Sequence, residues 1–234
     1  MYRRIIVKLS GESLAPRDKG ACFAANRVDE VARALCRLAD TGVQLGVVMG
    51  GGNIWRGRFT EEMDPVNADQ MGMLATVINA LAVEDAIRRM GHKATVYTAQ
   101  EMNRFSRLYT AKAAQESLEA GEIVLLAGGT GNPFFTTDTG AALRAAELKA
   151  DAVFKGTTVE GVFDGDPHKD PNAKLIRRIS YHEAIDRGLR VMDLTAFMLC
   201  MEQKVPEVRV FSMEDLENLL RVASGEEIGT VVHL

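Results

Sequence analysis

The residues best suited to chemistry follow short apolar runs, at points where a buried strand would end. The longest such stretch, Gly129-Thr-Gly-Asn-Pro-Phe-Phe-Thr-Thr137, comes directly after five apolar residues and before a helix expected to begin near Asp138. Its glycines let backbone N–H groups approach a ligand, and the hydroxyls of Thr136 and Thr137 offer donors to an anion. The same loop would also suit a plain strand-to-helix turn, with Thr137 or Asp138 as the helix cap and Pro133 for stiffness. The loop alone does not decide between these interpretations.

Three further strand ends carry residues of the same kind. They are Lys8-Leu9-Ser10-Gly11 after the apolar run 5–9, Gly50 to Asn53 with Arg56 after the run 43–49, and Lys155 to Thr158 after the run 151–155. Parallel strands place their carboxyl ends at one edge of a sheet, and that edge is where open α/β sheets bind ligands. A lysine at this edge is a mobile charge suited to phosphate, although Lys8 could also be an edge-strand lysine whose tip reaches water.

Four such loops leave room for two phosphorylated ligands placed end to end. That arrangement predicts phosphoryl transfer, because the reaction depends on positioned anions and neutralised charge rather than on a protein nucleophile. Neither a P-loop nor a dinucleotide fingerprint is present in the sequence. His92, His168, His182 and His233 lie outside the four loops, which argues against a Ser-His-acid triad or a histidine metal site.

The acids Asp164, Asp166 and Asp170 suggest the start of a calcium loop. However, His168 occupies the third ligand position, and the glycine and distal glutamate of an EF-hand are missing. We therefore interpret this segment as a solvated loop beside a ligand and expect no metal held by the protein itself.

Composition limits the class of protein. The chain has 234 residues, of which 47% are hydrophobic and 26% charged, with a net charge of -4. This balance is ordinary for a globular chain and does not favour a general nucleic-acid or membrane-surface binder. The beginning of the chain has too few apolar residues for a signal peptide, and no run reaches transmembrane length. Cys22, Cys36 and Cys200 form no paired motif, so we expect a reducing cytoplasm.

The order of strand and helix patterns predicts an α/β fold, in which a mostly parallel sheet carries helices on both faces. The expected strands are 5–9, 43–49, 93–97, 123–127, 151–155, 207–211 and 229–233, and the expected helices are 26–42, 68–90, 111–119, 139–148, 180–187, 193–203 and 213–224. No clean linker appears, so one domain spans residues 1–234, with lobes at roughly 1–150 and 151–234. The apolar face of the 68–90 helix suits either the core alone or a subunit interface as well.

Five motifs, in order along nearly the whole chain, resemble those of the bacterial UMP kinases of the amino acid kinase superfamily. They are Val7-Lys-Leu-Ser-Gly-Glu12, Gly50-Gly-Gly-Asn-Ile-Trp-Arg-Gly57, Asp69-Gln-Met-Gly-Met-Leu-Ala-Thr76, Gly129-Thr-Gly-Asn-Pro-Phe-Phe-Thr-Thr-Asp138 and Val191-Met-Asp-Leu-Thr-Ala-Phe197. The resemblance implies the three-layer α/β/α amino acid kinase fold and the reaction ATP + UMP → ADP + UDP in pyrimidine nucleotide (CTP) synthesis. It also implies Mg²⁺ carried by the ATP phosphates, a homohexamer, and GTP and UTP as candidate effectors.

The resemblance also assigns roles to residues. Lys8 would stabilise charge on the transferred group, and Asp138 would orient the lysines. The ATP positions would be Lys8, Leu9, Ser10, Gly11, Gly52 and Arg56, with Thr157, Phe163 and Asp166 on the adenosine side. The UMP positions would be Gly51, Asp69, Thr130, Gly131, Asn132, Pro133, Phe134, Phe135, Thr136 and Thr137. For Lys155 and Asp193, a structural role and a direct catalytic role both stay open.

Three departures from the family pattern concern regulation and assembly, and one of them is the segment Glu101-Met-Asn-Arg-Phe-Ser-Arg-Leu-Tyr109. Gln70 stands where the family usually has His, and Lys19-Gly-Ala-Cys-Phe23 replaces a segment that resembles Gly-Phe-Gly. Two other functions share the glycine loops: a sister kinase that phosphorylates an acyl or amino-acid carboxylate, and an oxyanion-storing cage of the same fold. The sister kinase is disfavoured by the presence of Asp69 and Asn132-Pro-Phe-Phe135. The storage cage is disfavoured by the intact residues Lys8, Arg56 and Asp138.

Overall fold

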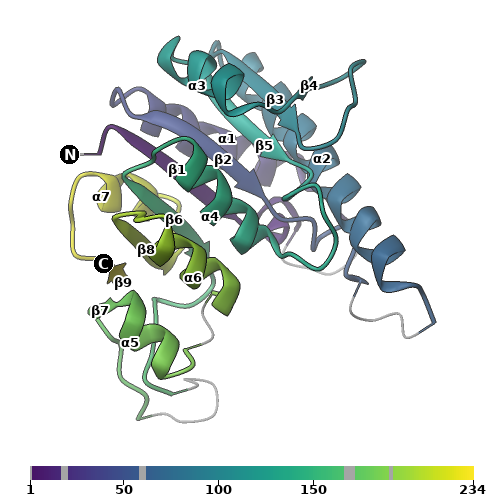
Figure 1. The fold of residues 1–234 in the computed structure, drawn as a ribbon. Helices are drawn as coiled ribbons and strands as arrows, with labels where there is room; N and C mark the ends of the chain where they lie inside the picture. Colours follow the sequence, from purple (N-terminus) through teal and green to yellow (C-terminus); the bar gives the residue numbers. More distant parts are fainter. Residues whose placement is uncertain (1, 17–20, 58–61, 166–171, 190–191) are drawn as a thin grey trace.

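A single sheet forms the middle layer of the molecule. The computed structural model describes residues 2–16, 21–57, 62–165, 172–189 and 192–234. The strands are β1 (Arg4–Leu9), β2 (Gln44–Met49), β3 (Ala94–Thr98), β4 (Arg107–Leu108), β5 (Ile123–Ala127), β6 (Ala152–Thr157), β7 (Arg178–Ser180), β8 (Glu207–Ser212) and β9 (Thr230–His233). Within the described residues they form a nine-stranded sheet in the order β4-β3-β5-β2-β1-β6-β8-β9-β7 (Figure 1).

Every neighbouring pair in this sheet is parallel except β8 and β9. The central strands β1 and β5 are short and rich in Val, Ile and Leu, as expected for strands buried on both faces, although β1 also carries Arg4 and Lys8. In β1, Val7 lies beside Val47 of β2 and Phe154 of β6. The strands of residues 1–150 and those of residues 151–234 meet at the β1–β6 pair, so one continuous sheet joins the two halves.

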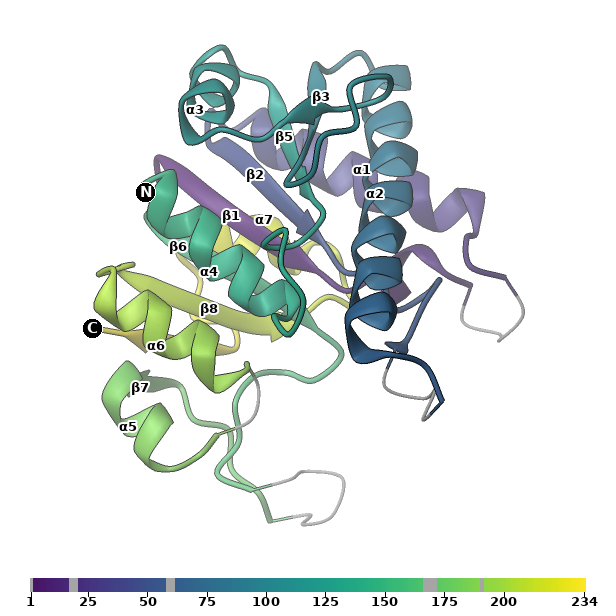
Figure 2. The same cartoon turned by 45° about the vertical axis from the view of Figure 1, so that its right-hand side comes forward.

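Helices cover both faces of the sheet, which confirms the predicted three-layer α/β/α fold (Figures 1 and 2). They are α1 (Ala25–Ala39), α2 (Pro65–Arg89), α3 (Ala111–Glu119), α4 (Thr137–Glu147), α5 (Tyr181–Asp186), α6 (Leu194–Glu202) and α7 (Asn218–Ala223), with a 3₁₀ turn at Gly11–Leu14. Successive β1 residues face opposite layers: Ile5 and Val7 pack with α1, α2 and α7, whereas Ile6 packs with α4 and α6. Each such side chain stabilises the fold by about 1.5–3 kcal/mol through burial.

The seven strands and seven helices expected from the sequence are all present, with shifted ends. The last helix is much shorter than predicted, since it begins at Asn218 rather than Met213. Ser212 and Asp215 accept hydrogen bonds from the backbone N–H groups of Glu214 and Glu217, and these local bonds hold the segment in turns instead of a helix. The sequence pattern missed β4 and β7, which have only two and three residues.

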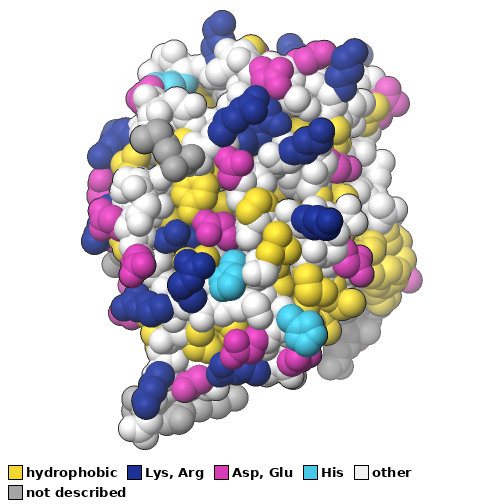
Figure 3. Space-filling view, turned by 60° about the vertical axis from the view of Figure 1, so that its left-hand side comes forward, with side chains coloured by type: hydrophobic (Ala, Val, Ile, Leu, Met, Phe, Trp, Pro, Cys, Tyr) yellow, Lys and Arg dark blue, Asp and Glu magenta, His cyan; other side chains and the backbone are white. Residues whose placement is uncertain are grey.

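Charges of both signs cover the surface seen in Figure 3, where Lys and Arg side chains alternate with Asp and Glu rather than gathering in one basic region. No helix in the described part of the chain is long and apolar enough to cross a lipid bilayer.

Candidate active site

Four loops meet at one edge of the sheet. They follow β5, β2, β1 and β6, which are consecutive neighbours in the sheet and mutually parallel. Their carboxyl ends therefore open on the same side, as predicted from the sequence. The structure thus brings the Lys8, Gly50–Asn53, Gly129–Asp138 and Lys155–Thr158 segments together.

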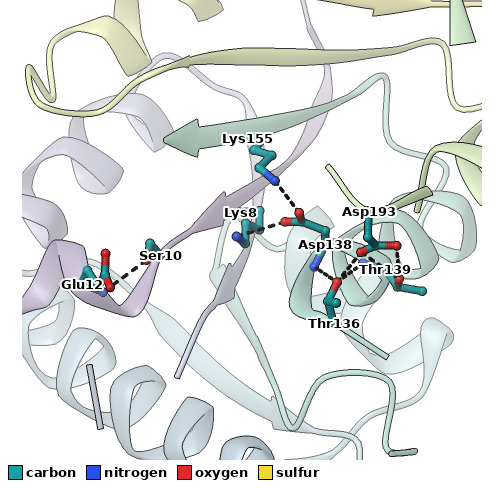
Figure 4. Close-up of polar contacts among 8 residues, drawn as sticks. All are labelled: Lys8, Ser10, Glu12, Thr136, Asp138, Thr139, Lys155 and Asp193. Carbon is teal, nitrogen blue, oxygen red and sulfur yellow. Dashed lines mark hydrogen bonds and ion pairs between the residues drawn. The ribbon is translucent and has the colours of Figure 1, made fainter. Parts of the chain in front are cut away.

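A compact charge cluster lies at the centre of this edge. The Asp138 carboxylate, on the first turn of α4, lies between two lysines on neighbouring strands (Figure 4). Lys8 Nζ is 3.0 Å from Asp138 Oδ1, and Lys155 Nζ forms an ion pair with Oδ2. Asp138 and Lys155 are each only 8% exposed. One carboxylate therefore fixes the positions of two ammonium groups, and Lys155 joins Lys8 as part of the site.

Burial and charge act in opposite directions on this cluster. Burial alone would raise the pKa of Asp138, but the charges of Lys8 and Lys155 more than offset that effect and leave the pKa below its ordinary value. Burial lowers the pKa of Lys155, helped by the charge of Lys8, while Asp138 and Asp193 oppose the fall. The carboxylate therefore stays ionised, and the charge on Lys155 depends on the acids around it.

The start of α4 is capped by Thr136. Its Oγ1 accepts from the N–H groups of Asp138, at 3.1 Å, and Thr139, at 3.3 Å. The expectation of Thr137 or Asp138 as the cap is therefore wrong: Thr136 has the extended backbone of a cap, and the helix begins at Thr137. Among the described residues, the backbone N–H and hydroxyl of Thr137 have no partner, so they are the donors that this helix start offers to an anion.

Two cavities adjoin the cluster and share Gly52 and Arg56 in their walls. We call the larger one, of about 1050 Å³, the donor cavity; its lining includes Lys8, Leu9, Ser10, Lys155 and Thr157. We call the other, of about 790 Å³, the acceptor cavity; its lining includes Gly51, Asp69, Phe134, Phe135, Thr136 and Thr137. Arg56 forms an ion pair with Glu12 at this junction. Two elongated ligands can therefore lie end to end, as the loops predicted.

Glycines are required where the two loops at the junction touch. A Cβ on Gly11 would lie 2.7 Å from the carbonyl oxygen of Gly50, and one on Gly51 would lie 2.9 Å from that of Gly72. Both distances are shorter than real contacts, so a side chain at Gly11 would push the two loops apart, and one at Gly51 would push its loop away from helix α2. Gly11 is itself buried beneath the donor cavity and supports it rather than lining it.

Asn79 on α2, which was not predicted from the sequence, holds the Gly50–Asn53 turn in place through hydrogen bonds. Its Nδ2 donates to the Gly50 carbonyl at 2.6 Å and to Asn53 Oδ1 at 2.8 Å, and its Oδ1 accepts from Asn53 Nδ2 at 3.0 Å. The residue is fully buried on α2. The sequence did carry a signal for this residue: Asn79 is an amide within the apolar face of the helix, and a buried amide must find hydrogen-bond partners.

The loop before α4 is held against α2 by Asp69. Its Oδ2 accepts from the backbone N–H of Phe134 at 2.6 Å, and Phe134 has a positive φ of 70° that few residues other than glycine adopt. Thr130, Gly131, Asn132 and Pro133 lie outside the lining of the acceptor cavity. Gly131 and Pro133 instead line a neighbouring cavity of about 300 Å³, together with Gln70.

The predicted adenosine side is only partly assembled. Thr157 lines the donor cavity, whereas Phe163 pairs with Leu175 through an isolated β-bridge and is not among the described lining residues. Asp166 lies outside the described residues. Met213 and Glu214, which the sequence analysis did not single out, line the cavity here. Among the described residues, no cluster of three or more His, Cys, Asp or Glu could hold a metal ion.

Comparisons with known proteins identify the family and the fold of the chain. The model of the amino acid kinase family matches residues 3–212. The chain is 50% identical over 234 residues to a uridylate kinase of Bacteroides thetaiotaomicron, covering 99% of this chain and 98% of that protein. The crystal structure of UMP kinase from Bacillus anthracis superposes with a TM-score of 0.94 at 33% identity, covering 99% of this chain and 96% of the other. That of UMP kinase from Ureaplasma parvum gives 0.93 at 32% identity, with full coverage of both chains.

Proposed function

The chain belongs to the amino acid kinase family, among its uridylate kinases, and we propose that it transfers the γ-phosphoryl group of ATP to UMP. The products are ADP and UDP, and UDP feeds pyrimidine nucleotide synthesis, including that of CTP. The observation that carries the proposal is the meeting of two cavities at Gly52 and Arg56, beside the cluster of Lys8, Asp138 and Lys155.

We assign ATP to the donor cavity. Lys8, Ser10 and Lys155 would meet its phosphates, with Gly52 and Arg56 at the γ-phosphate end. To do so, Arg56 must exchange its ion pair with Glu12 for the phosphate. Thr157 would lie toward the adenosine, while the roles of Phe163 and Asp166 stay predictions from the resemblance.

We assign UMP to the acceptor cavity. The N–H and hydroxyl of Thr137 suit its phosphate, and Gly51 lines the same cavity. Asp69, Phe134 and Phe135 would surround the nucleoside, because a carboxylate pairs with ribose hydroxyls and aromatic rings contact a base. The roles of Thr130, Gly131, Asn132 and Pro133 stay predictions, as they do not line this cavity. Among the lining residues that the structure describes, those of the acceptor cavity all come before residue 150, whereas both lobes build the donor cavity.

Transfer would proceed by in-line attack of a UMP phosphate oxygen on the γ-phosphorus. That oxygen is already ionised near neutral pH, so the protein needs no general base. Lys8 would stabilise the charge on the transferred group, and Asp138 would hold both lysines toward it. A kinase that uses ATP requires a divalent cation, which we take to be Mg²⁺. It would be carried by the ATP phosphates, where it would neutralise their charge.

We further propose that the chain self-associates through α2. Met71, Leu74 and Ile78 repeat along one side of this helix and are 39%, 49% and 47% exposed. An apolar row of this kind on a long helix is typical of a subunit interface. The homohexamer, the cytoplasmic location and the GTP and UTP effectors stay expectations that rest on the resemblance.

An assay with a panel of candidate phosphoryl acceptors tests the proposed function. ADP release from Mg-ATP would be measured in parallel with UMP, CMP, dCMP, AMP, GMP, aspartate and N-acetylglutamate. We expect strong turnover with UMP alone. Turnover with a carboxylate would make the chain a sister kinase, and no turnover by folded protein would favour a binding or storage role.

A further inference from the structure

Asp193 lies where the second lobe contacts the start of α4. It directly precedes α6, and its Oδ1 caps that helix by accepting from the N–H of Ala196 at 2.8 Å. In Figures 1 and 2, α6 runs beside α4 on the same face of the sheet. A cap on α6 alone would use one side of the carboxylate and leave the other free.

The rest of the carboxylate binds the first turn of α4. It accepts from Thr139 Oγ1, with distances of 3.0 and 3.2 Å to its two oxygens, and Oδ2 accepts from Thr136 Oγ1 (Figure 4). Thr136 Oγ1 already accepts from the backbone N–H groups of Asp138 and Thr139, so its single proton must be donated to Asp193. The direction of the chain of hydrogen bonds is therefore fixed, from the Asp138 N–H through Thr136 to Asp193.

We propose that Asp193 is a positioning residue for phosphoryl transfer. Acting through Thr136, it holds the first turn of α4 so that Asp138 meets both lysines and Thr137 faces the acceptor cavity. The inference rests on the function proposed above. It also explains why the hydroxyl of Thr136, unlike that of Thr137, is not available to a substrate.

The charge of Asp193 has a second effect on the site. Lys155 is faced by Lys8 from β1, by Asp138 from α4 and by Asp193 before α6, while its neighbour on β8 is the neutral Val210. Of these groups, Asp138 and Asp193 raise the pKa of Lys155 and Lys8 lowers it. Removing the negative charge at position 193 should therefore make Lys155 lose its proton at a lower pH.

The test uses the full-length chain with Asp193→Asn, Thr136→Val, Thr136→Ser and the Asp193→Asn/Thr136→Val pair. Asparagine caps a helix as well as aspartate does, so Asp193→Asn keeps the cap on α6 while its Nδ2 cannot accept the proton of Thr136. Ser180→Ala is the matched control, since Ser180 caps α5 in the same lobe by accepting from Glu183 at 3.1 Å and lies outside both cavities. The measurements are kcat and KM for ATP and UMP, the pH profile of kcat, and Tm.

Losing a hydrogen bond to a charged group should lower kcat by about tenfold or more in Asp193→Asn and in Thr136→Val. The kcat of the double variant should be no lower than that of the less active single variant. Thr136→Ser should keep the activity of the wild type, and KM for ATP should stay within about threefold of the wild-type value in every variant. The basic limb of the kcat profile should move to lower pH in Asp193→Asn and not in Thr136→Val. Ser180→Ala should lower Tm with kcat unchanged.

Two outcomes overturn the inference. One is a wild-type kcat in Asp193→Asn. The other is a double variant whose losses in kcat are additive and whose pH profile of kcat is unchanged, because Asp193 would then act only as a helix cap. Failure of the proposed function is a separate result, because it would appear as a wild-type protein that does not phosphorylate UMP.

Discussion

Replacing Asp138 with asparagine removes the charge that lets two lysines share one site. Lys8 and Lys155 contact opposite oxygens of its carboxylate, so their ammonium groups are held close to each other. At an effective dielectric constant of about 20, two unit charges a few ångströms apart repel by about 3 kcal/mol. The asparagine side chain could still accept one hydrogen bond but could not offset this repulsion. A loss of about 3 kcal/mol in the transition state lowers kcat by about 10²-fold.

The assay is single-turnover transfer from Mg-ATP to UMP at saturating nucleotide, which separates the chemical step from product release. Asp151→Asn provides the matched control. That carboxylate also accepts backbone hydrogen bonds, from the N–H groups of Arg3 at 2.6 Å and Arg4 at 2.9 Å, but it lies at the opposite end of β1. It should lower stability without changing the rate of transfer.

Transfer by Asp138→Asn within about threefold of the wild-type rate, at an unchanged Tm, would contradict this prediction. In that case the lysines would hold their positions and charges without the carboxylate, and the central cluster would not be part of the mechanism.

Three further predictions address the lysine, the pH response and the assembly. Lys8→Ala should lower turnover by several orders of magnitude while calorimetry still detects UMP binding, and unchanged turnover would remove Lys8 from the mechanism. The pKa of Asp138 lies below its ordinary value, so the stability that its carboxylate contributes is present above pH about 4 and lost as the pH falls through the lower folded-state pKa. Urea denaturation should therefore show the stability difference between wild type and Asp138→Asn shrinking below pH about 4, and a constant difference would contradict this. Leu74→Glu should dissociate the assembly in sedimentation velocity, with Glu116→Gln, on the exposed side of α3, as a control; an unchanged sedimentation coefficient would exclude α2 as the interface.

The sequence was sufficient for the elements that carry strong apolar patterns. The buried strands are rich in Val, Ile and Leu, and their parallel order follows from the intervening helices, so the edge with four loops could be predicted before the structure. The two shortest strands showed no pattern, since two or three residues cannot establish a period.

The finer parts of the site depend on contacts between distant residues. Whether Thr136 or Thr137 caps α4 depends on which residue first adopts helical φ and ψ, and Asp193, 57 residues later, helps to fix that point. The sequence left the roles of Lys155 and Asp193 open for the same reason. The roles of these two residues depend on partners on β1 and α4, and only the folded sheet brings these partners into contact with them.

We propose that the two adjoining cavities hold both nucleotides at once, with their phosphates meeting beside Lys8. Calorimetry with the bisubstrate compound P1-(5′-adenosyl)-P5-(5′-uridyl) pentaphosphate tests it most directly, because this molecule must occupy the donor and acceptor cavities at once. We expect one molecule to bind per chain, the bound compound to exclude both ATP and UMP, and Lys8→Ala to weaken its binding. Binding that excludes only one of the two nucleotides would contradict the claim.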